Sequence, residues 1–381
     1  MARLSRLPWQ AEDFAALRAL QARSVHAVLL HGAAGIGKKV LALDYAQARL
    51  CESPRNDGHA CGQCRACGWF AAGAHPDLRV VVPDVMARWR LTGDDDEADK
   101  ADEEGEGGSA VTPPAEPDTD AARSARASRE IRIDAVRRLA RFLTTSTHRG
   151  GLRVVVLAPA ERITTEAANA LLKMLEEPPA GTLFILATDA IDDVLPTVRS
   201  RCLLVRCRAP GRAAALAWLH SGGVAEPETA LAEAGGSPLA AWLAAQNDDE
   251  DQEAATRLDA DLRRTLVALL AQGPALSAAE VAGRLGKTIP VEASISLLQR
   301  WAWDLLALMA GGAVRYHPAQ VQALAHLARS TSAPVILAWV DQLNRLQATR
   351  DHPLNARLVV ESALLGYASV LGAAPAGVLD R

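Results

Sequence analysis

The feature that most constrains the fold is a glycine-rich turn that joins an apolar run to a helical pattern. Val25–Leu30 is the apolar run, residues 32–39 read Gly-Ala-Ala-Gly-Ile-Gly-Lys-Lys, and Lys38–Leu50 has a helical pattern. Glycines in such a turn let backbone N–H groups surround a phosphate at the start of a helix. The order of strand, loop and helix predicts the first unit of an α/β nucleotide-binding domain.

Four residues of this loop are candidate phosphate ligands, and one expected metal ligand is missing from it. Gly32, Gly35 and Gly37 supply the backbone, and Lys38 would reach the outer phosphate oxygens. The next position usually carries a Ser or Thr whose hydroxyl binds Mg²⁺, but here it is Lys39, which offers no oxygen. We therefore expect a vestigial nucleotide site that binds ATP weakly or not at all.

Further apolar runs predict a parallel sheet with helical crossovers. Arg153–Leu157 contains only Val and Leu after its first residue, as a central parallel strand should. Helices are expected over Ile133–Thr144 and after an N-cap at Thr164 or Thr165. Strands that alternate with helices favour parallel pairing. Other strands are expected at Leu78–Val82, Leu183–Ala187 and Leu203–Arg206.

Catalytic acids are missing from the end of the strand Arg153–Leu157. Proteins that hydrolyse ATP with such a loop need one acid to hold Mg²⁺ and another group to activate water. Here the strand runs into Ala158 and Pro159, which can neither bind a metal nor accept a proton. Glu161 follows after the strand has ended and is a poor substitute. We expect no intrinsic ATPase activity.

Charge and composition divide the chain into parts. The net charge is -4, yet Asp94–Asp120 holds twelve acids and one base, a local charge of -11 that leaves +7 for the rest. We interpret residues 92–128 as a disordered acidic insert, because they contain almost no large apolar side chain. After Arg208 the pattern is helical, with a polar break at 247–253. The expected domains are an α/β domain over 1–208, a small helical domain over 209–247 and a helical bundle over 254–381.

Two C-terminal segments have distinct helical patterns. Apolar residues at positions 295, 298, 302, 305 and 309 recur at a spacing of three to four, which predicts an amphipathic helix. Leu358–Leu371 is apolar almost all round, which predicts a helix buried within the bundle.

Four of the six cysteines cluster with the spacing of metal ligands. Close thiolate pairs converge on one ion, and four thiolates complete a tetrahedral Zn²⁺ site. We predict a structural zinc module over 51–67 and leave His59 and His75 out of the ligand set; the alternatives are four free buried thiols or a catalytic metal with an open position. The predicted ligands, spaced C-x₉-C-x₂-C-x₂-C, are Cys51, Cys61, Cys64 and Cys67.

Hydropathy predicts no membrane span, since no run of about 18 uncharged apolar residues occurs. Charged residues interrupt Met1–Gln21, so this segment lacks the core of a signal peptide. Without an export signal, clustered cysteines indicate metal binding rather than disulfides. We expect a cytoplasmic protein.

Three motifs resemble the clamp-loader branch of the AAA+ ATPases. They are Asn169–Pro179 (NALLKMLEEPP), Phe184–Thr188 (FILAT) and the triplet Ser200-Arg201-Cys202. In that branch the arginine of the triplet reaches across a subunit interface into the ATP site of a neighbour. The resemblance implies that Arg201 is such a trans arginine finger, catalytic for the neighbour's site, and that Thr188 occupies the first sensor position of the vestigial site.

The resemblance extends toward the C-terminus. Gly236–Leu239 is similar to the start of a helix that carries a second sensor arginine in active relatives, and Leu239 stands in its place. Residues 354–361 resemble the final helix of non-hydrolysing clamp-loader subunits. The fold implied is a parallel-sheet AAA+ P-loop domain, a small helical lid domain and a C-terminal all-α collar bundle.

The resemblance also implies a function and partners. The chain would be a non-hydrolysing subunit of the bacterial DNA polymerase III clamp loader, with Zn²⁺ as a structural metal. It would sit in a hetero-pentameric ring with gamma/tau ATPase subunits and a delta subunit. Through that complex it would act on the sliding clamp and primed DNA during DNA replication, as a component of the polymerase holoenzyme.

Two alternatives are open. An active gamma/tau-like ATPase would need acids at positions 158 and 159 and a hydroxyl at position 39, which the sequence lacks. A zinc-bearing nucleic-acid module would need a basic, aromatic-rich patch beside the cysteines. The sequence holds only Arg65, Trp69 and Phe70 there, and we interpret the two aromatic residues as packing residues.

Overall fold

Residues before and after the Pro210–Gly211 link form two compact units. The predicted acidic insert at 92–128 lies outside the described residues except for its last residue, and the polar break at 247–253 lies outside them as well. The computed structural model describes residues 6–23, 25–89, 128–144, 151–245, 258–286, 289–348 and 356–372.

The first unit contains a five-stranded parallel sheet with the order β2-β3-β4-β1-β5. Strands β3 and β4 lie inside the sheet, and every residue of both is buried, so the predicted central parallel strand is confirmed. Strand β1 begins two residues later than predicted because its pairing with β4 starts at Ala27 and continues to His31, opposite Thr188. The strands are Ala27–His31 (β1), Leu78–Val81 (β2), Arg153–Leu157 (β3), Thr182–Thr188 (β4) and Leu203–Arg206 (β5).

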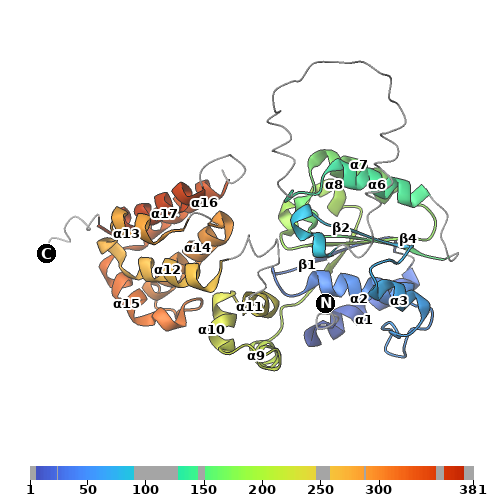
Figure 1. The fold of residues 1–381 in the computed structure, drawn as a ribbon, viewed down its shortest axis with the longest axis horizontal. Coiled ribbons are helices and arrows are strands. Elements are labelled where there is room, and N and C mark those ends of the chain that lie inside the picture. The colour runs from blue at the N-terminus through green and yellow to red at the C-terminus, as the bar shows by residue number, and fades with distance from the viewer. Residues whose placement is uncertain are drawn as a thin grey trace, which may run out of the picture. The chain divides into compact units, whose positions relative to one another are not determined.

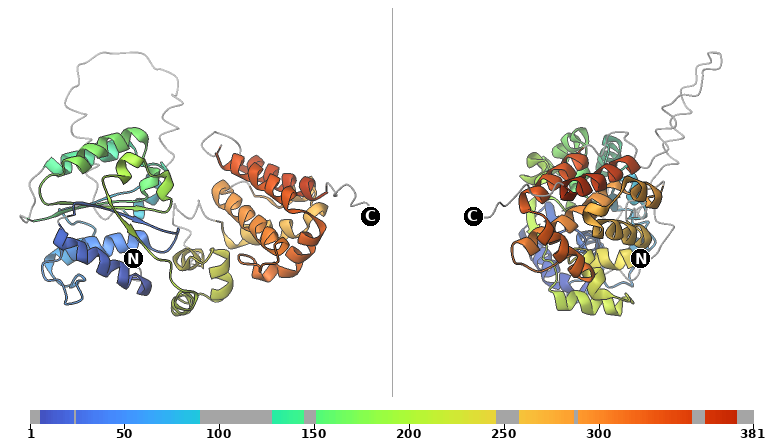
Figure 2. Two further views of the ribbon diagram at one scale, coloured as in Figure 1. Left: turned by 180° about the vertical axis from the view of Figure 1, so that it is seen from behind. Right: turned by 90° about the vertical axis from the view of Figure 1, so that its left-hand side faces the viewer.

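Helices cover both faces of this sheet (Figures 1 and 2). Helices α1, α2 and α3 lie on one face, and α6, α7 and α8 lie on the other. This arrangement confirms the predicted α/β fold class. The bounds are Ala11–Ala19 (α1), Lys38–Leu50 (α2), Arg65–Ala71 (α3), Ile133–Thr144 (α6), Thr165–Glu176 (α7) and Pro196–Arg199 (α8).

Helix α7 begins after Thr164, one of the two N-cap residues that its sequence predicts. The Thr164 hydroxyl accepts a hydrogen bond from the Ala167 N–H at 3.3 Å, which satisfies one of the unpaired donors of the first turn. Leu171 and Leu175 are fully buried against the sheet in a cluster that includes Phe184. The helix therefore has a fixed face, and its last residue lies at a defined place beside α8.

The described residues of the second unit form helices joined by turns, with no strand among them. A small apolar cluster lies among α9, α10 and α11, and a larger one among α12 to α17. The division of this unit into a lid and a collar stays a prediction. The bounds are Arg212–Ser221 (α9), Pro227–Glu233 (α10), Pro238–Ala245 (α11), Ala260–Ala271 (α12), Ala278–Arg284 (α13), Val291–Met309 (α14), Val321–Ser330 (α15), Ala333–Ala348 (α16) and Ala356–Gly372 (α17).

The predicted amphipathic helix is α14, whose residues 295, 298, 302 and 305 are all fully buried. The prediction that α17 is buried all round is wrong at Leu358, which is 59% exposed. Successive helical residues are about 100° apart, so Leu358 lies on the side opposite the buried Val360, Leu364 and Tyr367. None of the helices in the described ranges has the length and apolar character needed to cross a membrane.

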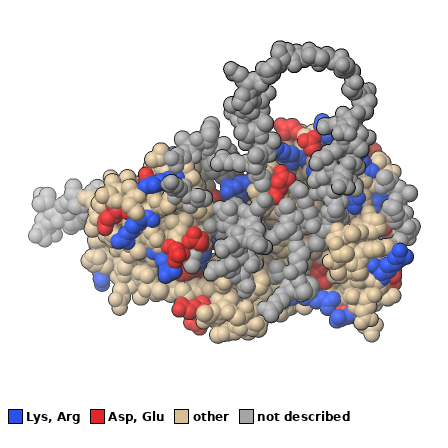
Figure 3. All heavy atoms as spheres, viewed as in Figure 1, with Lys and Arg blue, Asp and Glu red and all other residues tan. Residues whose placement is uncertain are grey.

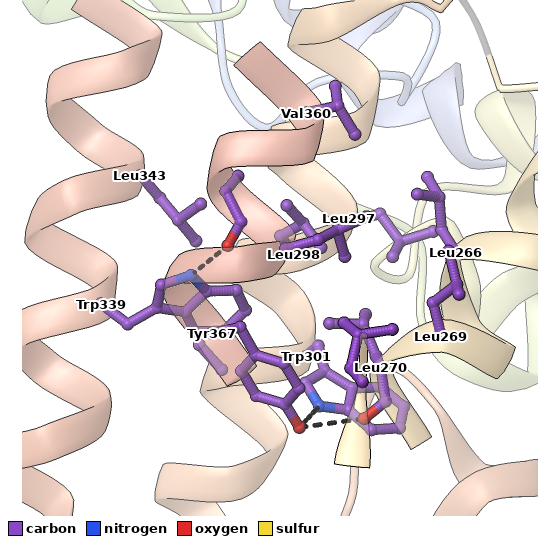
Figure 4. Packing of buried hydrophobic residues seen from close by; sticks show 14 of the residues in the cluster. Leu266, Leu269, Leu270, Leu297, Leu298, Trp301, Trp339, Leu343, Val360 and Tyr367 are labelled. Carbon is purple, nitrogen blue, oxygen red and sulfur yellow. Dashed lines mark hydrogen bonds between the residues drawn. The ribbon is translucent and has the colours of Figure 1, made fainter. Parts of the chain in front are cut away.

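The larger cluster contains a buried hydrogen-bond chain, drawn in Figure 4. The Trp301 indole N–H donates to the Tyr367 hydroxyl at 3.0 Å, and that hydroxyl donates to the Leu270 carbonyl at 3.1 Å. The Trp339 indole N–H donates to the Ala363 carbonyl at 2.9 Å. These bonds satisfy polar atoms that burial would otherwise leave unpaired, and they tie α12, α14, α16 and α17 together.

The substitution Tyr367→Phe should lower the free energy of unfolding of the chain by about 2 kcal/mol, because two buried groups lose their partner. Urea denaturation measures this change. Tyr316→Phe is the matched control, since the Tyr316 hydroxyl has no hydrogen bond to a described residue. Equal effects of the two substitutions would contradict the role assigned to the buried chain.

Candidate functional site

The glycine-rich loop between β1 and α2 has the backbone conformation that its sequence predicts. Gly32, Gly35 and Gly37 all have positive φ, at 151°, 69° and 91°. A Cβ on Gly37 would lie 2.1 Å from Leu7 Cδ1, and one on Gly32 would lie 2.5 Å from the Cys207 carbonyl oxygen. The positive φ favours glycine at both positions, and the approach to a backbone oxygen also excludes a side chain at Gly32.

An N-terminal segment holds this loop, and the sequence patterns did not reveal it. The segment is the short 3₁₀ helix Pro8–Gln10. The Trp9 indole N–H donates to the Ile36 carbonyl at 2.9 Å, and the Gln10 amide donates to the Gly37 carbonyl at 2.7 Å. A side chain that donates a hydrogen bond to a backbone carbonyl produces no recognisable spacing in the sequence. The contact between this segment and the loop is therefore seen only in the structure.

Lys38, the candidate phosphate ligand, is already bound within the chain. Its ammonium donates to the carbonyls of Gly32 at 2.7 Å and Ala33 at 2.5 Å, and it pairs with Asp189 Oδ1 at 2.5 Å. An ammonium has three donors, so all three are used. Lys38 is also 4% exposed, and a phosphate could reach it only by displacing one of these partners.

Lys39, which replaces the metal-binding hydroxyl, lies away from the loop. Its ammonium sits 4.5 Å from the centre of the Trp89 ring and 3.8 Å from the Met86 sulfur. A cation over an aromatic face is stabilised by the ring's charge distribution. The side chain therefore has a packing role next to the 3₁₀ helix Asp84–Trp89 and supplies no oxygen for Mg²⁺.

The end of β3 carries no acid, but two acids lie close to the end of β4. Ala158 is buried, as is Thr188, whose hydroxyl accepts the Ala190 N–H at 3.1 Å. Glu161 Oε1 accepts the Asp189 N–H at 3.1 Å, and Glu161 Oε2 is buried without a hydrogen-bond partner in the described residues. The sequence predicts that Glu161 is a poor substitute for the missing acid, and no sequence pattern singles out Asp189.

Arg201, the candidate finger, lies between α8 and β5 and is one-third exposed. Its Nη1 donates to the Thr197 carbonyl at 2.9 Å and to the Ser200 hydroxyl at 3.3 Å. Its Nη2 pairs with the Glu176 carboxylate at the end of α7. Both Arg201 and Lys38 have partners within the chain, but Arg201 remains partly exposed whereas Lys38 is buried.

The four clustered cysteines have the geometry of a tetrahedral thiolate site. A metal–sulfur bond of about 2.3 Å gives about 3.8 Å between sulfurs at tetrahedral angles. The sulfur of Cys51 lies 3.5 Å from that of Cys61, 3.8 Å from that of Cys64 and 3.7 Å from that of Cys67, and all four lie within 4.8 Å of one another. The residues present therefore fit Zn²⁺.

Backbone N–H groups support the charge of these sulfurs. The amides of Gln63 and Cys64 donate to Cys61 Sγ at 3.4 and 3.3 Å, and the Cys67 amide donates to Cys64 Sγ at 3.4 Å. The bonds from Gln63 and Cys64 lower the pKa of the Cys61 thiol to about 6. Thiolates are the form that binds metal, so these bonds favour the form of Cys61 that Zn²⁺ requires, whereas burial raises the pKa of the Cys51 and Cys67 thiols.

Neither nearby histidine is placed as a ligand. His59 Nδ1 pairs with Asp44 Oδ2 at 2.9 Å, and its ring stacks on Phe14 at 3.7 Å. His75 is 2% exposed, and its Nδ1 accepts the Asp77 N–H at 3.1 Å. His59 thus joins the cysteine loop to α2 and α1.

The surroundings of the cysteines do not resemble a nucleic-acid platform. Trp69 contacts the Arg65 guanidinium, at 4.7 Å from the ring centre, and the His75 ring, at 5.8 Å between ring centres. On the face drawn in Figure 3, basic and acidic side chains of the described residues are interspersed. A platform for single strands needs aromatic faces open to bases within a basic groove.

Comparison with known proteins identifies relatives of the chain. The family model described as DNA polymerase III, delta subunit matches residues 13–210. Subunit delta′ of DNA polymerase III from Pseudomonas aeruginosa is 39% identical over 61% of this chain and 60% of that protein. The Escherichia coli subunit of the same name is 32% identical over 64% of this chain and 61% of that protein. The chain thus spans about 60% of the length of these two relatives.

Among solved structures, a DNA polymerase III gamma subunit-related protein from Thermotoga maritima is similar to the chain. The similarity covers 94% of this chain and 99% of that protein, with 15% identity and a TM-score of 0.41.

The purified chain should contain about one zinc ion, and Cys64→Ser should contain little or none, because three thiolates leave the tetrahedral site incomplete. Metal analysis after gel filtration measures this. Cys207→Ser is the control, since Cys207 lies outside the cluster and burial raises the pKa of its thiol to about 12. Full zinc content in Cys64→Ser would contradict the assignment.

The substitution Asp189→Asn should raise the affinity of the chain for ATP about tenfold. It removes a charged partner of Lys38, and a hydrogen bond between charged groups contributes on the order of 1.5 kcal/mol. Equilibrium dialysis with ATP measures this change. Asp193→Asn alters the net charge equally in the same loop and should leave the affinity unchanged. No gain from Asp189→Asn would show that Asp189 does not block the loop.

Proposed function

Because this chain belongs to the DNA polymerase III delta subunit family, we propose that it is a delta-prime-type subunit of a clamp loader. In this proposal the chain hydrolyses no ATP itself. It lends Arg201 to the ATP site of a neighbouring ATPase subunit during loading of the sliding clamp in DNA replication.

The state of the chain's own loop supports the absence of hydrolysis. Lys38 has no N–H left for a phosphate, and Lys39 supplies no oxygen for Mg²⁺. Ala158 and Pro159 follow β3 where an acid would be needed. Gly32, Gly35, Gly37, Lys38 and Thr188 then form a vestigial nucleotide site that binds ATP weakly or not at all.

One observation carries the proposed finger role. Of the two cations that matched motifs of phosphate chemistry, Lys38 is buried with every donor used, whereas the Arg201 side chain is 33% exposed. A planar guanidinium pairs bidentately with phosphate oxygens and stabilises the charge that develops as phosphoryl transfer proceeds. Arg201 can therefore act on a phosphate outside this chain.

The proposed partners follow from this role. They are gamma/tau ATPase subunits and a delta subunit in a hetero-pentameric ring in the cytoplasm, and, through the complex, the sliding clamp and primed DNA. Zn²⁺, held by Cys51, Cys61, Cys64 and Cys67, would fix the loop after α2 and take no part in the chemistry.

A second candidate is an active gamma/tau-like ATPase. Lys38 is retained in the loop, and Glu161 and Asp189 place two carboxylates near the end of β4, which is the observation in its favour. Mg²⁺ binds carboxylates, and hydrolysis needs such ligands near the phosphates. Brisk Mg²⁺-dependent hydrolysis by the isolated chain would favour this candidate, whereas background hydrolysis supports the first.

The decisive experiment uses a loader reconstituted from this chain and its ATPase partners. Arg201→Ala should lower ATP turnover at the neighbouring site by about 10³-fold or more, since such fingers contribute on that order. Clamp loading should be lost while the complex still assembles. Arg199→Ala is the control, because Arg199 is the last residue of α8, two residues before Arg201, and it pairs with the exposed Asp192 at 3.5 Å. Normal loading by Arg201→Ala would overturn the proposal.

A further inference from the structure

An ion pair joins two of the motifs that carry the family resemblance. Glu176 is the last residue of α7, in the segment NALLKMLEEPP, and Arg201 is the middle residue of the Ser-Arg-Cys triplet. Glu176 Oε1 pairs with Arg201 Nη2, and α7 contacts α8, the helix before the triplet. Two motifs that are separate in the sequence thus meet at a single guanidinium.

The other contacts of Arg201 come from its own turn. Nη1 donates to the Thr197 carbonyl at 2.9 Å and to the Ser200 hydroxyl at 3.3 Å. These bonds shape the turn after α8, but they cannot fix its arginine relative to another element. Among the polar contacts of this side chain with described residues, Glu176 alone lies outside α8 and the turn after it, so it sets the direction of the guanidinium relative to α7.

The guanidinium is held without being saturated. It has five N–H donors, and three of them reach Thr197, Ser200 and Glu176. One donor on Nη2 and the donor on Nε remain; Nε is buried without an acceptor in the described part of the chain, so the remaining Nη2 N–H is the donor left for a group outside it.

We infer that Glu176 is a positioning residue for Arg201, which it orients for a phosphate of the neighbouring subunit; the inference rests on the proposed finger role. The pair adds little to stability, because both side chains are partly exposed. Its effect is to restrict a long side chain before the reaction, so that less freedom is lost in the transition state. The negative end of the α7 dipole adds to the attraction for the cation.

The test measures ATP turnover in the reconstituted loader with variants at residue 176. Glu176→Ala should lower kcat about tenfold and leave the KM for ATP and the assembly of the complex unchanged, because only orientation is lost. Glu176→Gln should fall between the wild type and Glu176→Ala, since its amide oxygen still accepts a hydrogen bond without the charge. Glu176 is 46% exposed, so both substitutions should be tolerated by the fold.

Two comparisons separate this inference from the proposed function. Glu177→Ala removes the same charge one residue later, where the side chain is exposed, and should leave kcat unchanged. In the Arg201→Ala background, Glu176→Ala should have no further effect, because its target is gone. If Arg201→Ala lowers turnover but Glu176→Ala does not, the inference fails and the proposed function stands. If Arg201→Ala has no effect, the proposed function fails.

A rise in kcat with Glu176→Ala would also overturn the inference, since it would mean that the carboxylate withholds the arginine from the neighbour. An equal fall with Glu177→Ala would overturn it as well, because the effect would then come from charge at the end of α7 rather than from the ion pair.

Discussion

The α/β unit depends on how it accommodates one buried ammonium. A buried, unpaired charge costs several kcal/mol, so Lys38 must find acceptors within the fold. It takes two from the glycine-rich loop and one from Asp189 after β4. The contacts of the Lys38 ammonium therefore connect the loop, the start of α2 and the end of β4. The same three bonds occupy the N–H donors of Lys38 that a phosphate would need. The contacts that stabilise the glycine-rich loop therefore also account for the proposed lack of ATP hydrolysis.

Helix α2 is fastened at its other end as well. Cys51 follows its last residue and belongs to the thiolate cluster, so a bound Zn²⁺ would fix the end of the helix. Asp44 pairs with His59 of the cysteine loop, and burial raises the pKa of this carboxyl despite the opposing effects of His59 and Arg6. With Trp9 and Gln10 bonded to the carbonyls before the helix, both ends are held. Such a helix suits a subunit whose proposed task is to present a group rather than to respond to a nucleotide.

Lys38 and Arg201, the two cations that belong to sequence motifs, differ in how many of their N–H donors have no acceptor within the fold. Lys38 has three donors and three acceptors, whereas Arg201 has five donors and meets three acceptors. A fully satisfied cation has no hydrogen bond left to offer a ligand, and a partly satisfied one has. This difference, rather than the presence of either residue in a motif, underlies the proposed division of labour between this chain and its neighbour.

Local sequence patterns determined the elements of this protein and its sets of candidate residues. A continuous apolar run predicted β3, periodicity predicted α14, hydrogen-bonding capacity predicted a cap at Thr164 or Thr165, and cysteine spacing predicted four sulfurs around one point, because each depends on residues close together in the chain. The tertiary structure alone decided which partners the charged groups have. Asp189 meets Lys38, Glu176 meets Arg201 and Asp44 meets His59 only after strands and helices pack. Contacts between separate elements leave no periodic or spacing signal, so the state of each cation could not be read before the fold was known.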